Sequence, residues 1–258
     1  KKSLIMCAEK LAKKNKKIYK NGDYLTKVFN HDEISKSTVF KEALYSSVAE
    51  STCLPIPHVL KVYSIGDDWA IDSEYIEGET LEEMILKNPT DYKKYIDILI
   101  DWQLKILSIT VDGLPNMKDK FNSRISRLGK RTDVHIDATI RYELHIAMNR
   151  LSADKVLCHG DFVPDNLMVT PEGKFYILDW AHSTVGNKEP DIARTYLNML
   201  LDGHKDWAEY YLKSYTNRTD TAIQQIESWY PEVAATMMNQ FDSEKEREFL
   251  LSVINGIE

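Results

Sequence analysis

Short stretches in which apolar and polar residues alternate dominate the first 77 residues of the chain. Two of them flank the turn-forming sequence Asn21-Gly22-Asp23, a pattern typical of a β-hairpin. A helical stretch follows and must end before Pro55, because proline cannot continue a helix and restricts the residue before it. The predicted elements are strands over residues 17–20 and 24–29, a helix over 37–50, and strands over 58–64 and 69–75.

Beyond Gly78 the apolar residues recur with the spacing of helices. Residues 92–110 predict a long helix with an apolar stripe facing the core. One β-rich stretch, Val156–Asp179, interrupts the helices with an apolar strand, a polar loop, a second strand, a turn and a third strand, which together predict a hairpin. This order of elements is an α+β plan. We predict an N-terminal lobe over residues 1–77, with an antiparallel sheet and one helix, and a mostly helical C-terminal lobe over 78–258.

The composition, with 43% hydrophobic and 28% charged residues among 258, is that of an ordinary globular protein. A net charge of −7 argues against a dedicated nucleic-acid binder, and the longest apolar run, Leu4–Ala8, is far shorter than the roughly 20 residues that span a bilayer. Three widely spaced cysteines indicate neither a disulfide framework nor a zinc cluster. We therefore expect a cytoplasmic protein, a monomer, with no nucleic-acid and no membrane partner.

Positive charge is concentrated at the beginning of the chain. Residues 1–27 hold nine lysines against Glu9 and Asp23, a net charge of +7. Since the whole chain has a net charge of −7, the remaining residues together carry −14. This lysine cluster either meets phosphate groups or a nucleic acid, or forms a solvated strand face and loop.

The β-rich stretch carries the residues that phosphoryl transfer requires. It reads His159-Gly160-Asp161-x-x-x-x-Asn166, and a later strand ends in Asp179. A carboxylate that orients the attacking hydroxyl and accepts its proton is the role expected for Asp161. Hard oxygen ligands are needed to hold Mg²⁺ against nucleotide phosphates, a role that suits Asn166 and Asp179.

These motifs, with Ile177-Leu178-Asp179-Trp180 and Asp191-Ile192-Ala193-Arg194 after them, resemble the aminoglycoside phosphotransferase and choline kinase family. Members of that family are small-molecule kinases with the bilobal protein-kinase fold. The resemblance covers about residues 12 to 200. It implies that Asp191 and His159 support the catalytic loop, and that ATP or GTP is the phosphate donor.

The same resemblance assigns nucleotide-binding residues in the N-terminal lobe. Lys27 would contact the α- and β-phosphates, and Glu42 would pair with it, although Glu50 and Glu33 lie close enough in sequence to be alternatives. Backbone groups of Glu74 and Ile76 would meet the edge of the adenine ring.

The stretch Ala12–Lys17 departs from the family, because it contains lysines where a glycine-rich phosphate loop is usual. Either the lysines supply the positive charge, or the loop binds nucleotide poorly.

From these motifs we predict a phosphotransferase that moves the γ-phosphate of ATP or GTP to a hydroxyl of a small molecule. The alternative is a catalytically weak nucleotide-binding module of the same fold. A protein kinase is disfavoured, because Asp179-Trp180 replaces D-F-G and Asp191 follows after only 12 positions.

The acceptor is poorly defined by the sequence. An aminoglycoside-like, amino-alcohol or sugar acceptor fits the resemblance. Acidic residues in the C-terminal helices would attract a cationic acceptor, or are simply the surface of an acidic protein: Asp202, Asp206, Glu209 and Glu232.

Overall fold

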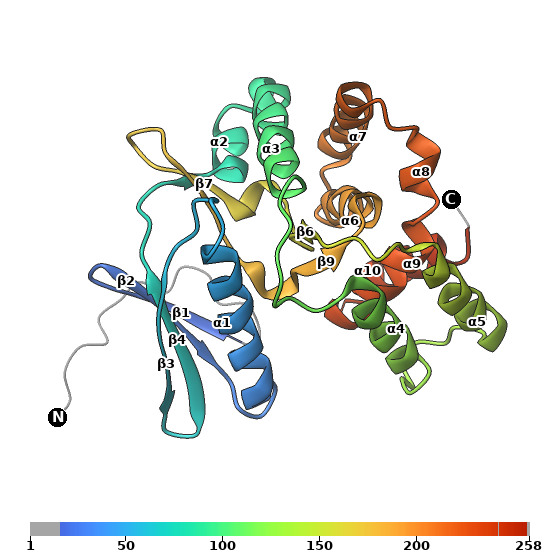
Figure 1. The fold of residues 1–258 in the computed structure, drawn as a ribbon, viewed down its shortest axis with the longest axis horizontal. Helices are drawn as coiled ribbons and strands as arrows, with labels where there is room; N and C mark the ends of the chain where they lie inside the picture. The colour runs from blue at the N-terminus through green and yellow to red at the C-terminus, as the bar shows by residue number, and fades with distance from the viewer. Residues whose placement is uncertain (1–15, 242, 257–258) are drawn as a thin grey trace. The chain divides into compact units, whose positions relative to one another are not determined.

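The computed structural model describes residues 16–241 and 243–256, which form two compact units (Figure 1). Of the described residues, the first unit comprises 16–81 together with Asp165–His182, and the second comprises Glu82–Pro164, 183–241 and 243–256. This interleaved division differs from the single boundary after residue 77 that the sequence suggested. The α+β fold, with an antiparallel sheet first and helices afterwards, is confirmed.

A four-stranded antiparallel sheet forms the beginning of the first unit, in the order β1-β2-β4-β3. The predicted hairpin is present, with Gly22 at φ 65° in its turn, a conformation that glycine adopts without strain. Helix α1 packs on the sheet through a core of Phe29, Val39, Ala43 and Ile71 (Figure 1). The bounds are β1 Lys16–Asn21, β2 Tyr24–Phe29, α1 Lys36–Glu50, β3 Val59–Ile65 and β4 Asp68–Glu74.

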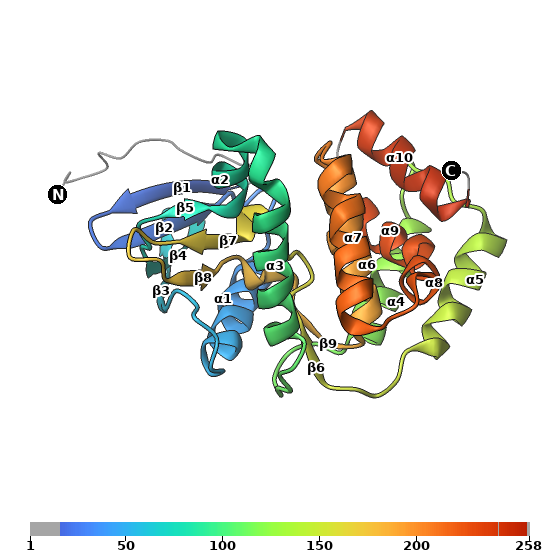
Figure 2. The ribbon, with the colours of Figure 1, turned by 90° about the horizontal axis from the view of Figure 1, so that it is seen from above.

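A second, three-stranded sheet places residues 165–182 in this unit. Its strands β5 (Glu79–Thr80), β7 (Leu167–Val169) and β8 (Phe175–Ile177) lie in the order β5-β7-β8 (Figure 2). A Cβ atom on Gly78 would lie 2.4 Å from the Val169 carbonyl oxygen, so only glycine permits this close approach. The Ile177 amide also donates to the Pro55 carbonyl at 2.9 Å. These contacts far apart in sequence are what the expected boundary missed.

The strand that precedes His159 does not join the β7–β8 hairpin, contrary to the prediction. This strand, β6 (Val156–Cys158), pairs instead with β9 (Thr184–Gly186) in the second unit. The amide of Leu157 also donates to the Ile109 carbonyl at 2.8 Å. For that reason helix α3 (Tyr92–Ile106) ends four residues earlier than the apolar spacing suggested.

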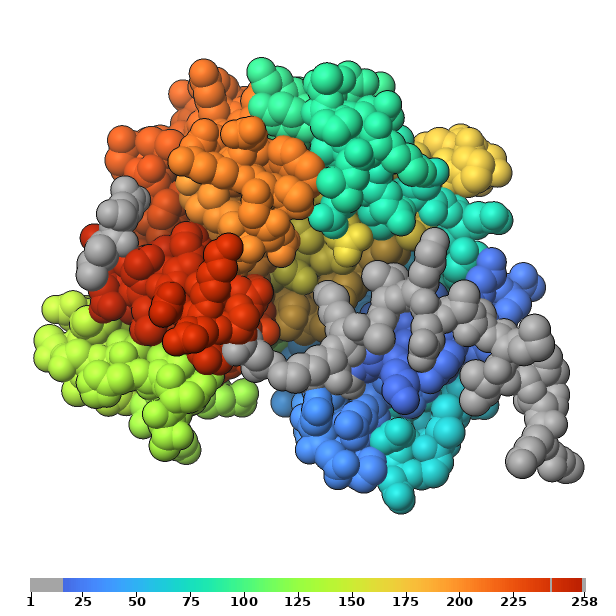
Figure 3. Space-filling model, turned by 180° about the vertical axis from the view of Figure 1, so that it is seen from behind, coloured from blue at the N-terminus to red at the C-terminus, as the bar shows by residue number. Residues whose placement is uncertain are grey.

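Helices make up most of the second unit. The apolar stripe of α3 is buried as predicted, with Ile96, Leu99 and Ile100 inaccessible to solvent. Helices α6, α7 and α9 pack side by side (Figure 2), and α10, in red, is exposed on one face of the unit (Figure 3). The remaining helix bounds are α2 Leu81–Lys87, α4 Met117–Leu128, α5 Ala138–Ala147, α6 Lys188–Leu201, α7 Lys205–Thr219, α8 Ile223–Glu227, α9 Tyr230–Met237 and α10 Glu244–Ile254.

No helix in the described part of the chain has both the length and the apolar character needed to cross a bilayer. Short 3₁₀ turns connect several elements: Pro89–Asp91, Met148–Arg150, Pro164–Asn166, Trp180–His182 and Met238–Gln240.

Candidate functional site

The residues predicted to act on nucleotide and acceptor fall into two groups, one in each compact unit. Four residues of chain separate Asp161, in the second unit, from Asn166, in the first. The first unit contains Lys27, Glu42, Glu74, Ile76, Asn166 and Asp179, and the second contains His159, Asp161 and Asp191.

Lys27 and Glu42 form an ion pair in the first unit. Lys27 lies in the middle of β2, Glu42 lies in the second turn of α1, and Lys27 Nζ is 3.0 Å from Glu42 Oε1. The two side chains are only 19% and 11% exposed. Burial acts to lower the pKa of Lys27, but the carboxylates of Asp179 and Glu42 outweigh it and raise that pKa above its ordinary value. Lys27 is therefore firmly cationic and lies within the electrostatic influence of Asp179.

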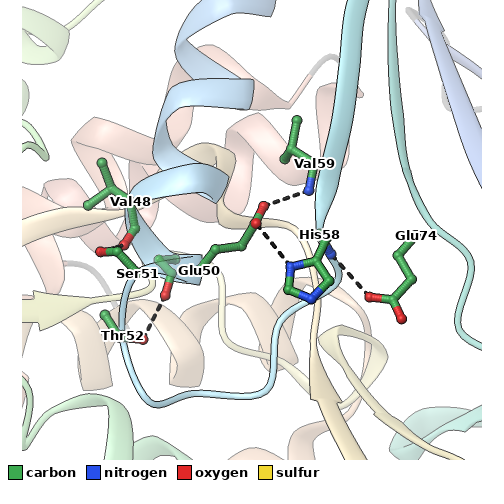
Figure 4. Close-up of polar contacts among 8 residues, drawn as sticks. Val48, Glu50, Ser51, Thr52, His58, Val59 and Glu74 are labelled. Atoms are coloured by element: carbon green, nitrogen blue, oxygen red, sulfur yellow. Dashed lines mark hydrogen bonds and ion pairs between the residues drawn. The ribbon is translucent and has the colours of Figure 1, made fainter.

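Glu50, one of the alternatives for the partner of Lys27, has a different role at the other end of α1 (Figure 4). Its Oε1 accepts a 2.6 Å hydrogen bond from the Val59 amide, and its Oε2 lies 3.2 Å from His58 Nδ1. The amide of His58 in turn donates to Glu74 Oε2 at 3.3 Å. Glu50 thus fixes the start of β3 beside the end of β4. The third alternative, Glu33, is exposed before the helix begins.

Asn166 and Asp179 lie at the open end of the β7–β8 hairpin. The Leu178 amide donates to the Asn166 carbonyl at 2.9 Å, which extends the pairing by one residue and sets Asp179 next to it in the chain. Asp179 has φ 55°, in the left-handed region that a residue with a side chain seldom adopts. Asp220 shares this conformation, but it caps the C-terminus of α7, whereas Asp179 follows a strand. Such backbone strain is concentrated at functional sites.

The chemistry of these two side chains fits a magnesium ion that is shared with a nucleotide. Within the described residues, no group of three or more His, Cys, Asp or Glu side chains is arranged to hold a metal ion. Mg²⁺ is commonly bound by one or two protein oxygens together with substrate phosphates. The carboxylate of Asp179 and the amide oxygen of Asn166 supply oxygen donors of that kind.

The lysine-rich stretch before β1 is described only in part, because Ala12–Asn15 lie outside the described residues. Of its lysines, Lys16 joins Lys27, Glu42 and Asp179 in a charged cluster of the first unit. Its Nζ is 3.6 Å from Asp179 Oδ2 and 3.9 Å from Glu42 Oε1. Lys17, the next residue, is exposed. The sequence placed both in one cluster and did not distinguish them.

Glu74 and Ile76, whose backbone groups are predicted to meet the adenine edge, lie at the end of β4 and just after it. The Glu74 amide donates to the His58 carbonyl at 2.8 Å, and the Tyr75 amide donates to the Asp23 carbonyl at 3.0 Å. Ile76 comes after the strand and is half-buried. The backbone is therefore held at Glu74 and Tyr75 where it leaves the sheet.

In the second unit, the loop His159–Phe162 follows β6 and carries Asp161. His159 is fully buried, and its Nδ1 accepts a 3.2 Å hydrogen bond from the Asp161 amide, which requires that nitrogen to be unprotonated. The His159 ring also packs at 5.4 Å from the ring of Phe162. The histidine thus shapes the loop from within.

One face of α6 holds this loop at three points. Asp191 Oδ1 accepts from the Gly160 amide at 2.7 Å, Thr195 Oγ1 donates to the Phe162 carbonyl at 3.0 Å, and Asn198 Nδ2 donates to Asp161 Oδ1 at 2.8 Å. The three positions are four and three residues apart, so they share one side of the helix. Sequence reasoning found Asp191 but missed Thr195 and Asn198. The signal available was the spacing of Asp191, Thr195 and Asn198, which places three polar residues on one side of the helix.

Further buried polar groups support the same helix. Gln103, on α3, is fully buried; its amide donates to Thr195 Oγ1 at 3.1 Å, and its carbonyl accepts from Tyr211 at 2.5 Å. Burial lowers the pKa of Arg194, although the Asp161 and Asp191 carboxylates act against this, and burial raises the pKa of Asp191. Helix α6, which holds the loop, is therefore itself tied to α3 and α7.

The acidic residues considered for a cationic acceptor do not form one group. Asp202 and Asp206 are exposed, and Glu209 is exposed and pairs with Lys205 at 3.6 Å. Glu232 is buried, lies 2.9 Å from Arg150, and has a pKa that burial raises. Glu232 is thus a structural residue of α9 in this arrangement.

Known structures share this fold. A thermostable mutant of aminoglycoside phosphotransferase APH(4)-Ia, in ternary complex with ADP and hygromycin B, is 15% identical, with a TM-score of 0.71 over 99% of this chain and 94% of that chain. Choline kinase LicA from Streptococcus pneumoniae is 19% identical, with a TM-score of 0.61 over 96% and 92%. ADP-bound aminoglycoside phosphotransferase APH(2'')-Ib is 19% identical, with a TM-score of 0.60 over 98% and 93%.

No curated protein sequence matches the chain. The sequence profile of the phosphotransferase enzyme family (APH), in contrast, matches residues 18–226, which include both groups of predicted site residues. The chain therefore belongs to the phosphotransferase enzyme family.

Proposed function

We propose that this protein transfers the γ-phosphate of ATP or GTP to a hydroxyl group of a small molecule. The observation that carries the proposal is the charged cluster of the first unit, in which the Lys27–Glu42 pair of 3.0 Å lies within the electrostatic influence of Asp179. Phosphoryl transfer depends mainly on positioning and on neutralising phosphate charge. A partly buried cation held by one carboxylate, near a second carboxylate able to bind metal, suits that task.

In this proposal the first unit binds the nucleotide. Lys27 contacts the α- and β-phosphates, Glu42 holds Lys27 in place, and Asn166 with Asp179 holds Mg²⁺. The backbone at Glu74 and Ile76 meets the adenine edge. Since the Glu74 amide already donates to His58, the group offered by Glu74 is its carbonyl.

The second unit supplies the base. Asp161 orients the acceptor hydroxyl and accepts its proton, while His159 and Asp191 maintain the loop that presents it. The acceptor is a small molecule of the aminoglycoside, amino-alcohol or sugar class. The likeness to structures with hygromycin B and to a choline kinase supports this range of acceptors without selecting among them. A cytoplasmic location and a monomeric state stay predictions.

The second candidate is a nucleotide-binding module without appreciable turnover. The observation that favours it is the absence of glycine from Ala12–Lys17. Close approach of backbone amides to phosphates is easiest at glycine, so a loop without it would hold the γ-phosphate less well.

One experiment separates the two candidates. The protein is incubated with γ-labelled ATP or GTP, Mg²⁺ and an aminoglycoside, choline or sugar panel, and its melting temperature is measured with each nucleotide in parallel. Label in a small-molecule product supports the phosphotransferase. A nucleotide-dependent rise in melting temperature with no labelled product supports the binding module, because a ligand of the native state alone stabilises it by mass action. No rise and no product would contradict both.

A further inference from the structure

Lys16 differs from the neighbouring lysines in its surroundings. It is the first residue of β1, and its side chain is 16% exposed, whereas Lys17 and Lys20 on the same strand are exposed. Successive residues of a strand point to opposite sides of a sheet, so Lys16 and Lys17 face different environments. The environment of Lys16 is the charged cluster of the first unit.

Two ammonium groups and two carboxylates make up that cluster. Glu42 Oε1 lies 3.0 Å from Lys27 Nζ and 3.9 Å from Lys16 Nζ, and Asp179 Oδ2 lies 3.6 Å from Lys16 Nζ. The formal charges of Lys16, Lys27, Glu42 and Asp179 therefore balance without any bound ion. Without Lys16, the carboxylates of Glu42 and Asp179 would have one neighbouring cation, Lys27, in this cluster.

The position of Lys16 has a consequence for the proposed metal site. A carboxylate that binds Mg²⁺ cannot keep an ammonium group as a close neighbour at no cost, because two cations at such short range repel each other strongly in a partly buried site. On the other hand, an ammonium group released from Asp179 would be well placed to meet incoming phosphates. A point charge on a flexible stem can make such a move.

We propose that Lys16 is the resident cation of Asp179: it neutralises this carboxylate in the nucleotide-free protein and gives it up to Mg²⁺ when a metal–nucleotide complex binds, its own charge then serving the phosphates. The inference rests on the proposed function and deepens it. Lys16 takes over part of the binding of phosphates that a glycine-rich loop performs with backbone amides. As a result, nucleotide binding depends less on Mg²⁺ than it would without Lys16.

The test compares nucleotide affinity with and without metal in matched variants. A fluorescent ADP analogue is titrated into the wild-type protein, Lys16→Met, Lys16→Arg and Lys17→Met, first with EDTA and then with Mg²⁺. Lys17→Met is the control, since it removes the same charge from the exposed side of the same strand. Melting temperatures without ligand establish that each variant is folded.

The inference predicts a loss confined to the metal-free condition. Without Mg²⁺, Lys16→Met should bind the analogue at least about tenfold more weakly, a change of about 1.4 kcal/mol. With Mg²⁺, its affinity should stay within about threefold of wild type, because the metal then neutralises Asp179. The variant loses a contact between Lys16 and the phosphates, but it also loses the competition between Lys16 and Mg²⁺ for Asp179, and the two effects offset each other. Lys16→Arg should retain most of the metal-free affinity, and Lys17→Met should match wild type.

Three outcomes would overturn the inference. Equal weakening of Lys16→Met with and without Mg²⁺ would make Lys16 an ordinary phosphate ligand. No change in either condition, or the same change in Lys17→Met, would make it a lysine without a specific role. If the wild-type protein bound no nucleotide in either condition, the proposed function itself would fail, and the inference with it.

Discussion

The buried amide of Asn198 donates a hydrogen bond to the carboxylate proposed as the catalytic base. Asn198 is 5% exposed, and its Nδ2 donates to Asp161 Oδ1 at 2.8 Å. A base must keep its carboxylate oriented toward the acceptor hydroxyl, and small misplacements cost large factors in rate. Asn198 is therefore a positioning residue, which acts through Asp161.

Replacement of Asn198 by alanine should lower kcat while nucleotide binding is preserved. The loss of a hydrogen bond to a charged group corresponds to about 1.5–3 kcal/mol, so kcat is expected to fall about tenfold or more. The KM for nucleotide should stay within about twofold, because the residues proposed to bind nucleotide lie in the other unit. Steady-state kinetics of Asn198→Ala, beside the exposed α6 control Lys188→Ala, measure both parameters. A rise in KM without loss of kcat would contradict this role.

The sequence indicates some of the site residues and conceals others for a physical reason. Asp161, Asn166 and Asp179 are visible because their spacing lies within one short stretch of chain. Asn198 is 37 residues from Asp161, and its role arises only when α6 packs against the loop. Lys16 likewise looks like any lysine of a basic segment until the fold brings it to Asp179.

At the scale of elements, helix α1 links two parts of the first unit through glutamates eight residues apart. Glu42 pairs with Lys27 on β2, and Glu50 bonds the Val59 amide at the start of β3. The helix thereby fixes both the middle of β2 and the start of β3. Its ends serve different purposes, although either glutamate fits the sequence pattern.

Removal of the Glu50 side chain should lower stability more than its position near a helix end would suggest. Hydrogen bonds to a charged group are stronger than neutral ones, so Glu50→Ala is expected to cost about 1–3 kcal/mol of unfolding free energy. Glu33→Ala, an exposed glutamate just before α1, should change it by about 0.5 kcal/mol or less. Chemical denaturation of both variants measures the difference. Equal stabilities would show that Glu50 does not clamp β3.

A chain of polar side chains from α7 to the loop that carries Asp161 is a second support at this scale. Thr195 Oγ1 accepts a hydrogen bond from Gln103 and donates one to the Phe162 carbonyl. The side chains of Thr195 and Gln103 are both buried. Thr195→Val keeps the shape but leaves a buried donor and a buried acceptor unpaired, at an expected cost of about 1–3 kcal/mol. Thr216→Val, which loses only bonds to its own helix, is the control. Denaturant unfolding that shows equal losses in both variants would argue against the chain as a support for the loop.

Element prediction succeeded where the pattern is local and failed where the partner is distant. The β1–β2 hairpin and α1 were confirmed, because the turn residues and helical spacing are contained in the segment itself. Strand β6 is only three residues long, and its apolar pattern does not specify β9 as its partner. The end of α3 was misplaced for the same reason: Ile109 is taken up by pairing with Leu157.

At the scale of the whole molecule, the two compact units divide the proposed chemistry. The first unit holds the charged cluster proposed for the metal and nucleotide, and the second holds the base with its supporting helix. Residues 165–182 belong to the first unit although they follow the loop that carries Asp161, so the residues proposed to bind metal lie in the same unit as the sheet proposed to bind nucleotide. This division predicts that the two functions can be damaged separately.

Turnover and nucleotide affinity of Asp161→Asn, compared with wild type, test this account most directly. The variant keeps the size of the side chain and removes the base, so kcat for phosphate transfer at saturating Mg²⁺–nucleotide should fall about 10²- to 10⁴-fold. The nucleotide Kd should stay within about threefold, because Lys27, Glu42 and Asp179 are unchanged. A variant that retains wild-type turnover, or one that loses nucleotide affinity and turnover together, would contradict the account.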